Sequence, residues 1–168
     1  AKLDVANALL WRMNPRRLDI EAYRDTLLRL SGRLDEKMFG PSDDLQSLRS
    51  ARRTVYARVS RGRQNSLLKN YDFPDAMQSA GGRDLTVTPL QQLFVMNSTF
   101  MHDAAAELAT AVASEPNNHA RLQRLFRQSL GREPTPRELD MATDFLQSGS
   151  LEQFAQALLS TNEEIFWP

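Results

Sequence analysis

Residues 88–112 read TPLQQLFVMNSTFMHDAAAELATAV, and this stretch decides the fold class. Thr88-Pro89 is typical of a helix start, because Pro tolerates the first helical position, where its missing N–H leaves no bond unmade. This helix is expected to run to Asn97, and Ser98 is expected to cap the next one. In the second helix, apolar side chains recur at helical spacing and form one stripe, made of Met101, Ala105, Leu108 and Val112. The pattern predicts helices that pack on one another.

Three further helices are predicted toward the C-terminus. Residues 115–118 break the pattern, a helix follows over about 119–130, and Gly131 marks its end. Thr135 and Glu138 form a capping box, in which each side chain bonds the backbone N–H of the other residue. The last predicted helix covers residues 151–159. The side chains expected to face the core are Leu122, Leu125, Phe126, Leu130, Leu139, Ala142, Phe145, Leu146, Leu151, Phe154, Ala155, Leu158 and Leu159.

Helical signals are fewer in the first half of the chain. Asn14-Pro15 predicts a helix start, since Asn can cap and Pro fits the first turn, and Gly32 predicts the end of that helix. Residues 40–44 predict a loop, because they are rich in side chains that bond their own backbone. Residues 66–70 predict a short helical turn.

Residues 54–59, TVYARV, alternate β-branched and aromatic members with other residues, which indicates a short strand. Residues 72–84 contain Pro74 and Gly81-Gly82 and predict a long irregular connection. We therefore expect a mainly α protein, an irregular bundle of about six or seven helices with a long central loop and at most one short strand or hairpin.

Charge is divided unevenly along the chain. The formal net charge is zero over 168 residues, but residues 1–83 carry +6 and residues 84–168 carry −6. Two explanations are open: the halves attract each other or match a neighbouring domain, or the basic half offers a face to a polyanion. Length favours one mainly helical domain over 1–168, with a basic half and an acidic helical half. Because Ala1 to Trp11 read as the continuation of a domain, we expect a piece of a longer protein.

Composition excludes several kinds of site. The chain has no cysteine, which excludes disulfides, thiolate metal sites, covalent haem attachment and a cysteine nucleophile. Its two histidines, His102 and His119, are too few for a histidine-rich metal centre, and no G-x-S-x-G motif accompanies them. No apolar run approaches the roughly 20 residues of a membrane span. Aromatic residues are not interleaved with a basic stripe, as single-strand nucleic-acid binding requires. We expect no metal, no cofactor, no membrane span and no nucleic-acid partner.

The centre of the chain carries a candidate polar site. Asp72 and Asp75 flank Phe73-Pro74, so both carboxylates can point into one volume, as an acid/base pair or a hard-cation site requires. The alternative is that they bond backbone amides and hold an irregular turn. Arginines surround this region in the sequence, and they either bind an anionic group or pair with the aspartates. They are Arg52, Arg53, Arg58, Arg61, Arg63 and Arg83.

A series of short motifs resembles a known family nearly end to end. The motifs are Leu10-Trp11-Arg12, Arg17-Leu18, Glu21-Ala22, Arg24-Asp25, Ser31-Gly32, Gly40-Pro41-Ser42, Arg52-Arg53-Thr54-Val55-Tyr56, Asp72-Phe73-Pro74-Asp75, Arg83 with Thr86 to Pro89, Gln91, Asn97-Ser98, Leu125 to Arg132 and Leu158 to Phe166. In this order they resemble the planctomycete-specific family of domains of unknown function found at the C-terminal end of large multidomain proteins, often downstream of a cytochrome c domain.

The resemblance implies a mainly helical C-terminal module of an exported protein, periplasmic or associated with the cell envelope. The activity of the family is not settled, so no catalytic residue is carried over. What is carried over is a polar pattern, matched here by Arg53, Tyr56, Asp72, Asp75, Arg83, Thr86 and Thr88. The candidate anion-binding positions beside it are Arg52, Arg58, Arg61 and Arg63.

These observations favour a non-catalytic interaction or scaffold module. Its expected contacts are other domains of the same polypeptide, a cytochrome c domain among them, while the central polar segment locks the long loop onto the helices. The alternative is a hydrolase or binding module for an anionic envelope or algal polysaccharide, with Asp72 and Asp75 as the acid/base pair and Arg83 on an anionic substituent. An accessory of electron transfer would need exposed Met or His side chains at a docking face.

Overall fold

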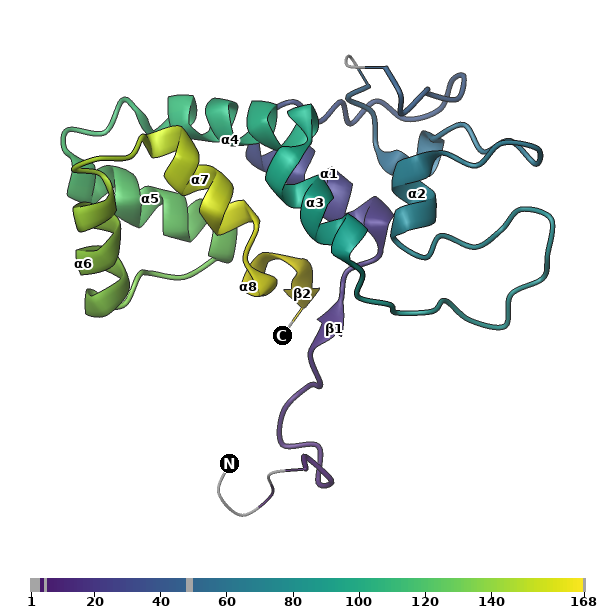
Figure 1. Ribbon diagram of the computed structural model, residues 1–168, viewed down its shortest axis with the longest axis horizontal. Helices are drawn as coiled ribbons and strands as arrows, with labels where there is room; N and C mark the ends of the chain where they lie inside the picture. Colours follow the sequence, from purple (N-terminus) through teal and green to yellow (C-terminus); the bar gives the residue numbers. More distant parts are fainter. Residues whose placement is uncertain (1–3, 5, 48–49, 168) are drawn as a thin grey trace.

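The computed structural model describes residues 4, 6–47 and 50–167. Within these residues the chain forms eight α-helices, one 3-10 helix and two strands of two residues (Figure 1). In chain order they are β1 (Arg16–Arg17), α1 (Ile20–Leu30), η1 (Thr54–Tyr56), α2 (Ser66–Asn70), α3 (Pro89–Asn97), α4 (Thr99–Val112), α5 (Asn118–Leu130), α6 (Pro136–Phe145), α7 (Leu151–Leu159), α8 (Asn162–Ile165) and β2 (Phe166–Trp167). The prediction of a mainly α protein is confirmed.

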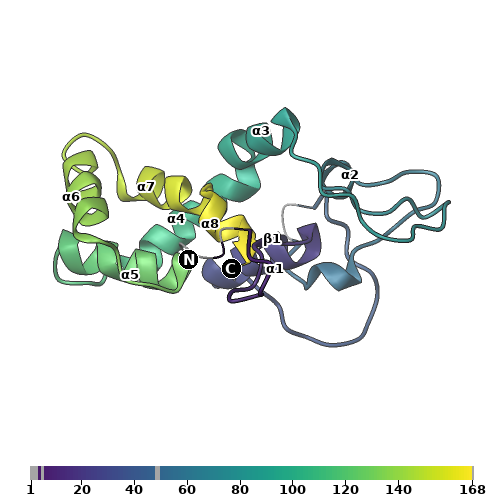
Figure 2. The same ribbon diagram turned by 90° about the horizontal axis from the view of Figure 1, so that it is seen from below.

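The helices and the irregular segments occupy different ends of the molecule. Figures 1 and 2 show α5, α6 and α7 at one end, α1 and α3 in the middle, and long loops around α2 at the other end. The first described residues, 4 and 6–15, form an arm that projects from β1 away from the helices, and we call it the N-terminal arm (Figure 1).

α4 lies at the centre of the hydrophobic core. It contacts α1, α3, α5 and α7, and its predicted apolar stripe is buried. The core also takes side chains from both halves of the chain, among them Ile20, Tyr23, Leu27, Leu122, Leu125, Ala155 and Leu159. Full burial of one large apolar side chain contributes roughly 1.5–3 kcal/mol. Helices from the basic half and from the acidic half therefore depend on the same core.

The helix boundaries predicted in the second half are confirmed. The side chain of Ser98 accepts the N–H of Met101 at the start of α4, and Thr135 and Glu138 form the predicted capping box at the start of α6. α5 ends at Gly131, whose φ of 68° lies in the left-handed region that favours glycine. These ends were readable because capping uses residues only three positions apart.

The predicted helix start at Asn14-Pro15 is wrong. α1 begins at Ile20, and residues 16–17 are extended and pair antiparallel with β2. The N–H of Leu18 donates to the carbonyl of Ile165 at 2.8 Å. The C-terminal segment thus supplies the partners of this stretch, and the local sequence carries no signal of a partner so far along the chain.

The strand predicted over 54–59 is wrong, because within this described range Ala57 makes an isolated bridge with Asp43 and no strand forms. Thr54–Tyr56 form the 3-10 helix η1. Asp25 of α1 accepts both the N–H of Thr54, at 2.7 Å, and its hydroxyl, at 2.6 Å. These two bonds hold the backbone in a turn where β-propensity alone favoured extension, since propensity is a weak preference that tertiary contacts override.

Phe145 was predicted to face the core, but it is exposed. It lies at the end of α6, and its ring packs beside that of Phe154 with the centroids 5.9 Å apart. The backbone of Gly149 also comes close, since a Cβ at that position would lie 2.5 Å from the Phe145 ring. The ring therefore covers the turn between α6 and α7 at the surface instead of entering the core.

Candidate functional site

Arg17 of β1 is the centre of a partly buried polar cluster. Its side chain is 5% exposed, and Nη2 lies 2.8 Å from Oδ2 of Asp72. Nη1 donates to the carbonyl of Thr86 and to Oε1 of Gln91, the latter at 3.2 Å. We call Arg17, Asp72, Thr86 and Gln91 the Arg17 cluster. The cluster joins four segments that are far apart in the sequence. Arg17 comes from β1, Asp72 from just after α2, Thr86 from the long loop and Gln91 from α3.

Asp72 occupies its place through an uncommon backbone conformation. Its φ is 60°, in the left-handed region that Asp tolerates better than most residues. Oδ2 accepts the N–H of Thr86 at 2.9 Å, and Oδ1 accepts the Thr86 hydroxyl at 2.6 Å. Burial disfavours ionisation, but the hydrogen bonds from Thr86 and Arg17 outweigh it and hold the pKa of Asp72 below its usual value. The carboxylate is thus ionised, and both of its oxygens are occupied.

Gln91 forms hydrogen bonds to both ends of the long loop, residues 71–88, and so holds the two ends together. Its Nε2 donates to the carbonyl of Asn70 at 2.7 Å and to that of Thr86 at 3.1 Å. The backbone N–H of Thr88 donates to Oε1 of Gln91 at 3.4 Å. One side chain therefore bonds the residue before the loop and two residues near its end.

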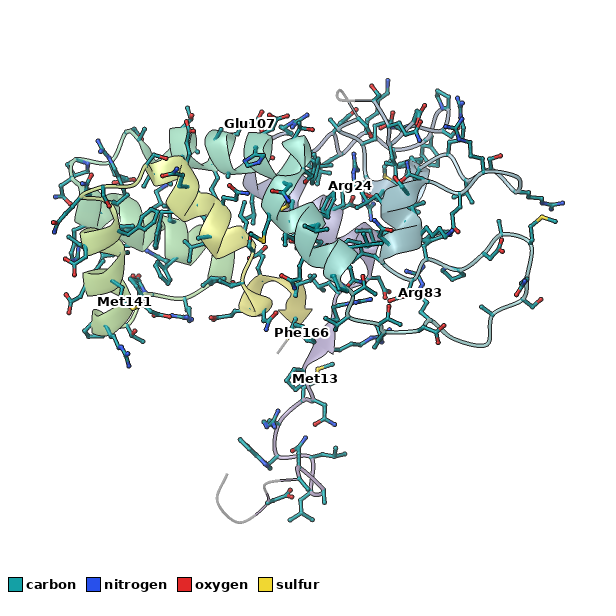
Figure 3. All side chains as sticks on the ribbon, in the orientation of Figure 1. Met13, Arg24, Arg83, Glu107, Met141 and Phe166 are labelled. Atoms are coloured by element: carbon teal, nitrogen blue, oxygen red, sulfur yellow. The ribbon has the colours of Figure 1, made fainter. Side chains whose placement is uncertain are left out.

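Arg83 holds the same loop to α1. Its two terminal nitrogens each lie 2.7 Å from one oxygen of Glu21, which is a bidentate pair. Its guanidinium also covers the ring of Phe73, with Cζ 5.2 Å from the ring centroid. Figure 3 labels Arg83 at the inner end of the loop. The positive charge of Arg83 is therefore paired with Glu21 of the same chain.

The other predicted site residues lie elsewhere. Asp75 is exposed and accepts the N–H of Met77 at 2.9 Å. Arg53 is exposed beside α1, where it lines a shallow hollow. Tyr56 accepts the N–H of Phe39 at 2.8 Å. Of the seven predicted positions, the structure brings Asp72 and Thr86 into direct contact, with Thr88 next to them through Gln91.

A second buried arginine, Arg24 of α1, belongs to one of the short motifs but was not among the predicted site residues. Its Nη2 donates to the carbonyl and hydroxyl of Ser50 at 2.7 and 2.8 Å. Its Nη1 donates to the Arg52 carbonyl at 3.1 Å and to the Thr54 hydroxyl at 3.0 Å. Burial lowers the pKa of Arg24. Its burial could have been predicted from helical spacing, because Arg24 follows Ile20 by four residues and therefore lies on the same inward face of α1.

The four candidate anion-binding arginines divide into two kinds. Arg52 is occupied, because it donates to the carbonyls of Pro41 and Phe39 and covers the ring of Tyr56, with Cζ 4.0 Å from the centroid. Arg58, Arg61 and Arg63 are exposed. Within residues 4, 6–47 and 50–167, no hydrogen bond or ion pair holds their side chains, and Arg58 and Arg63 line one hollow of about 260 Å³.

Another cavity, of about 140 Å³, lies beside Arg17 and is lined also by Tyr23, Tyr71 and residues of the C-terminal segment. Burial raises the pKa of Tyr71 to about 12. In the same segment, Glu164 of α8 is 6% exposed, and burial raises its pKa to about 8. Its Oε1 is buried without a hydrogen bond among the described residues.

Two properties of the described residues concern metal binding and membrane insertion. Among them no group of three or more His, Cys, Asp and Glu is arranged to hold a metal ion. None of their helices combines the length and apolar character needed to cross a membrane.

A family of known proteins matches most of the chain. Residues 1–146 match the PSD1 family, described as a protein of unknown function (DUF1553). The resemblance to a domain of unknown function is thereby confirmed. No curated protein and no solved structure matches the chain.

Proposed function

The chain belongs to this family of proteins of unknown function, and we propose that it is a non-catalytic interaction module. Its partners in this proposal are other domains of the same polypeptide, which dock on the N-terminal arm. The observation that carries the proposal is the apolar surface of that arm. Leu9, Leu10 and Met13 are 84%, 75% and 66% exposed, and Trp11 is 52% exposed. Contiguous exposed apolar side chains are typical of protein interaction sites.

Hydrogen bonds of its own give the N-terminal arm a defined shape. The carboxylate of Asp4 accepts the N–H groups of Ala8 and Leu9, both at 2.8 Å. The buried side chain of Asn7 donates to the carbonyl of Arg12 at 2.8 Å. A preformed loop loses less conformational entropy on binding than a random segment does. The arm therefore combines two properties of a docking element, an apolar surface and a fixed backbone.

No reaction is assigned in this proposal. Both oxygens of Asp72 are occupied by Thr86 and Arg17, and Arg83 is occupied by Glu21. Asp75 lies exposed and bonds the N–H of Met77. These groups are engaged in holding the long loop, so we assign them a structural role and assign no cofactor to the chain.

Hydrogen exchange of the longer polypeptide tests the docking of the arm. We expect the amides of residues 6–14 to exchange more slowly in the full polypeptide than in the isolated chain, because docking excludes water from them. A variant with Leu10→Ser and Met13→Ser is expected to lose that protection. Met38→Ser with Val55→Ser is the matched control, since both residues are exposed apolar side chains outside the arm. Equal exchange of residues 6–14 in the two proteins would overturn the proposal.

A second candidate function is binding of an anionic polysaccharide. It is supported by Arg58 and Arg63, which are exposed, share one hollow and have no partner among the described residues. On the resemblance alone, we also propose that the protein is of planctomycete type, exported to the periplasm or envelope, with a cytochrome c domain among its neighbours in the polypeptide. Fractionation of cells with an antibody to the chain checks the location.

A further inference from the structure

Resting on the second candidate function above, we infer that the hollow between Arg58 and Arg63 binds a sugar residue that carries one singly charged oxyanion, a sulfate half-ester or a carboxylate. The hollow has a volume of about 260 Å³ and is lined by Asp44, Gln46, Arg58, Ser60, Arg63, Gln64 and Asn65. This volume is slightly below the roughly 300 Å³ at which typical small-molecule sites begin, so the hollow has room for one sugar residue and not for an oligosaccharide. We call it the Arg58–Arg63 hollow.

Several other arginines among the described residues already have internal partners, unlike the two in this hollow. Arg17, Arg83 and Arg132 are held by carboxylates at 2.8 Å or less, and Arg24 and Arg52 are held by backbone carbonyls and neutral side chains. Arg58 and Arg63 have neither kind of partner within the described residues. Two guanidinium groups that share a concave surface without an internal partner offer parallel N–H donors to an external oxyanion.

The backbone that carries the two arginines is fixed. The N–H of Arg58 donates to the carbonyl of Asp43 at 2.7 Å, and the N–H of Asp43 donates to the carbonyl of Tyr56 at 2.8 Å. Arg63 and Ser60 form a bridge across a tight turn. Figure 1 shows this segment as a loop next to α2. Fixed attachment points lower the entropy cost of gathering both guanidinium groups on one ligand.

Charge in the hollow selects a singly charged group. Arg58 and Arg63 contribute two positive charges, and the carboxylate of Asp44 in the same lining opposes one of them. Asp44 is held in place because its Oδ1 accepts the N–H of Gln46 at 3.0 Å. A phosphate monoester carries close to two negative charges at neutral pH and would meet this carboxylate. A sulfate half-ester or a carboxylate balances the net charge of the lining.

The remaining lining favours a sugar over a nucleobase or a lipid tail. All seven lining side chains are polar, and the neutral ones are a hydroxyl and three amides. Gln64 is held by a bond from its Nε2 to the carbonyl of Phe73 at 2.9 Å, and Oδ1 of Asn65 accepts the N–H of Leu67 at 2.9 Å. Hydroxyl and amide groups bond sugar hydroxyls. Single-stranded nucleic acids instead require aromatic faces for stacking.

Titration of the whole chain with defined polymers tests the inference. The probes are dextran sulfate, polygalacturonate, neutral dextran and a single-stranded oligonucleotide, each at low and moderate salt, followed by calorimetry. We expect dextran sulfate or polygalacturonate to bind and neutral dextran not to bind. The charged polymer that binds identifies the oxyanion. Charge attraction is strongest at low salt, so absence of binding by both charged polysaccharides there would overturn the inference.

Matched variants separate the hollow from net charge. Arg58→Gln with Arg63→Gln is expected to weaken binding about tenfold or more, since each charged hydrogen bond lost has an effect of that order. Arg29→Gln with Arg137→Gln removes the same charge from exposed arginines elsewhere and is expected to change affinity less than threefold. Asp44→Asn is expected to tighten binding.

Three outcomes of these titrations contradict the inference. Equal losses of affinity in the two double-arginine variants would show that binding depends on net charge alone. Unchanged affinity in Asp44→Asn would show that the Asp44 carboxylate does not select the charge of the ligand. Oligonucleotide binding with the same dependence on Arg58 and Arg63 would assign the hollow to nucleic acid. None of these outcomes bears on the N-terminal arm, whose hydrogen exchange is measured without polysaccharide.

Discussion

The guanidinium of Arg17 lies between three acceptors from separate segments, Asp72, Thr86 and Gln91. We expect Arg17→Met to lower the free energy of unfolding by about 3 kcal/mol, because Asp72, Thr86 and Gln91 all lose a charged hydrogen-bond donor. Urea denaturation measures this change. Arg16→Met is the control, since Arg16 is the exposed member of β1. A loss of less than 1 kcal/mol in Arg17→Met would contradict the importance given to the Arg17 cluster.

Glu164 makes stability depend on pH. Its pKa is raised from 4.5 to about 8 in the folded protein, so the folded chain retains a proton that the unfolded chain releases. The free energy of unfolding is therefore expected to fall as pH rises from about 4.5 to about 8, by at most about 5 kcal/mol, and to level off above that range. The negative charge of neighbouring Glu163 adds to the effect of burial and raises the pKa of Glu164 further.

Chemical denaturation between pH 4.5 and 9 checks this dependence. In Glu164→Gln the decline is expected to disappear, because the amide cannot ionise, whereas Glu152→Gln on the exposed face of α7 is expected to keep it. A decline that persists unchanged in Glu164→Gln would show that other groups cause it.

At the scale of the element, α6 depends on its capping box. The side chain of Thr135 accepts the N–H of Glu138, and Glu138 accepts the N–H of Thr135 at 2.7 Å. Arg132 beside it, with help from the same Thr135 N–H, lowers the pKa of Glu138 to about 2. We expect Thr135→Ala to lower the free energy of unfolding by about 1 kcal/mol, the usual effect of a lost N-cap.

Thermal unfolding followed by circular dichroism measures that loss. Thr110→Ala within α4 is the control, because the Thr110 hydroxyl bonds the carbonyl four residues earlier and caps nothing. We expect this control to be close to neutral, since Ala is the better helix former. Equal losses in the two variants would contradict the assignment of the cap.

At the scale of the whole molecule, the two ends of the chain are joined. β1 pairs with β2, Leu18 bonds Ile165, and Arg132 holds Glu163 of α8. Removal of residues 161–168 is expected to speed amide exchange at Leu18 strongly and to lower the melting temperature, because the cover over Tyr23 and Arg17 is lost. Exchange by mass spectrometry measures it. Slow exchange at Leu18 in the shortened chain would contradict this role of the C-terminal segment.

Most ion pairs among the described residues form within one half of the chain, so they leave the opposite net charges of the two halves unchanged. Arg17 with Asp72 and Arg83 with Glu21 are pairs inside residues 1–83, and Arg132 with Glu138 is a pair inside the second half. Among the described residues, the ion pairs that cross between halves are those of Arg33 with Asp103 and Glu107, at 3.8 and 3.7 Å. Pairs this exposed contribute little, so the shared hydrophobic core joins the halves.

The sequence by itself determined the fold class, the helices after residue 88 and their caps, because periodicity and capping act over three to seven residues. It also indicated that Asp72 and Thr86 belong to one polar pattern. Only the tertiary structure decided that Arg17 binds Asp72, that residues 16–17 are extended and that residues 54–56 turn. It also decided that Arg58 and Arg63 share a hollow without internal partners. Each of these depends on contacts between residues distant in the chain, and local spacing carries no record of such partners.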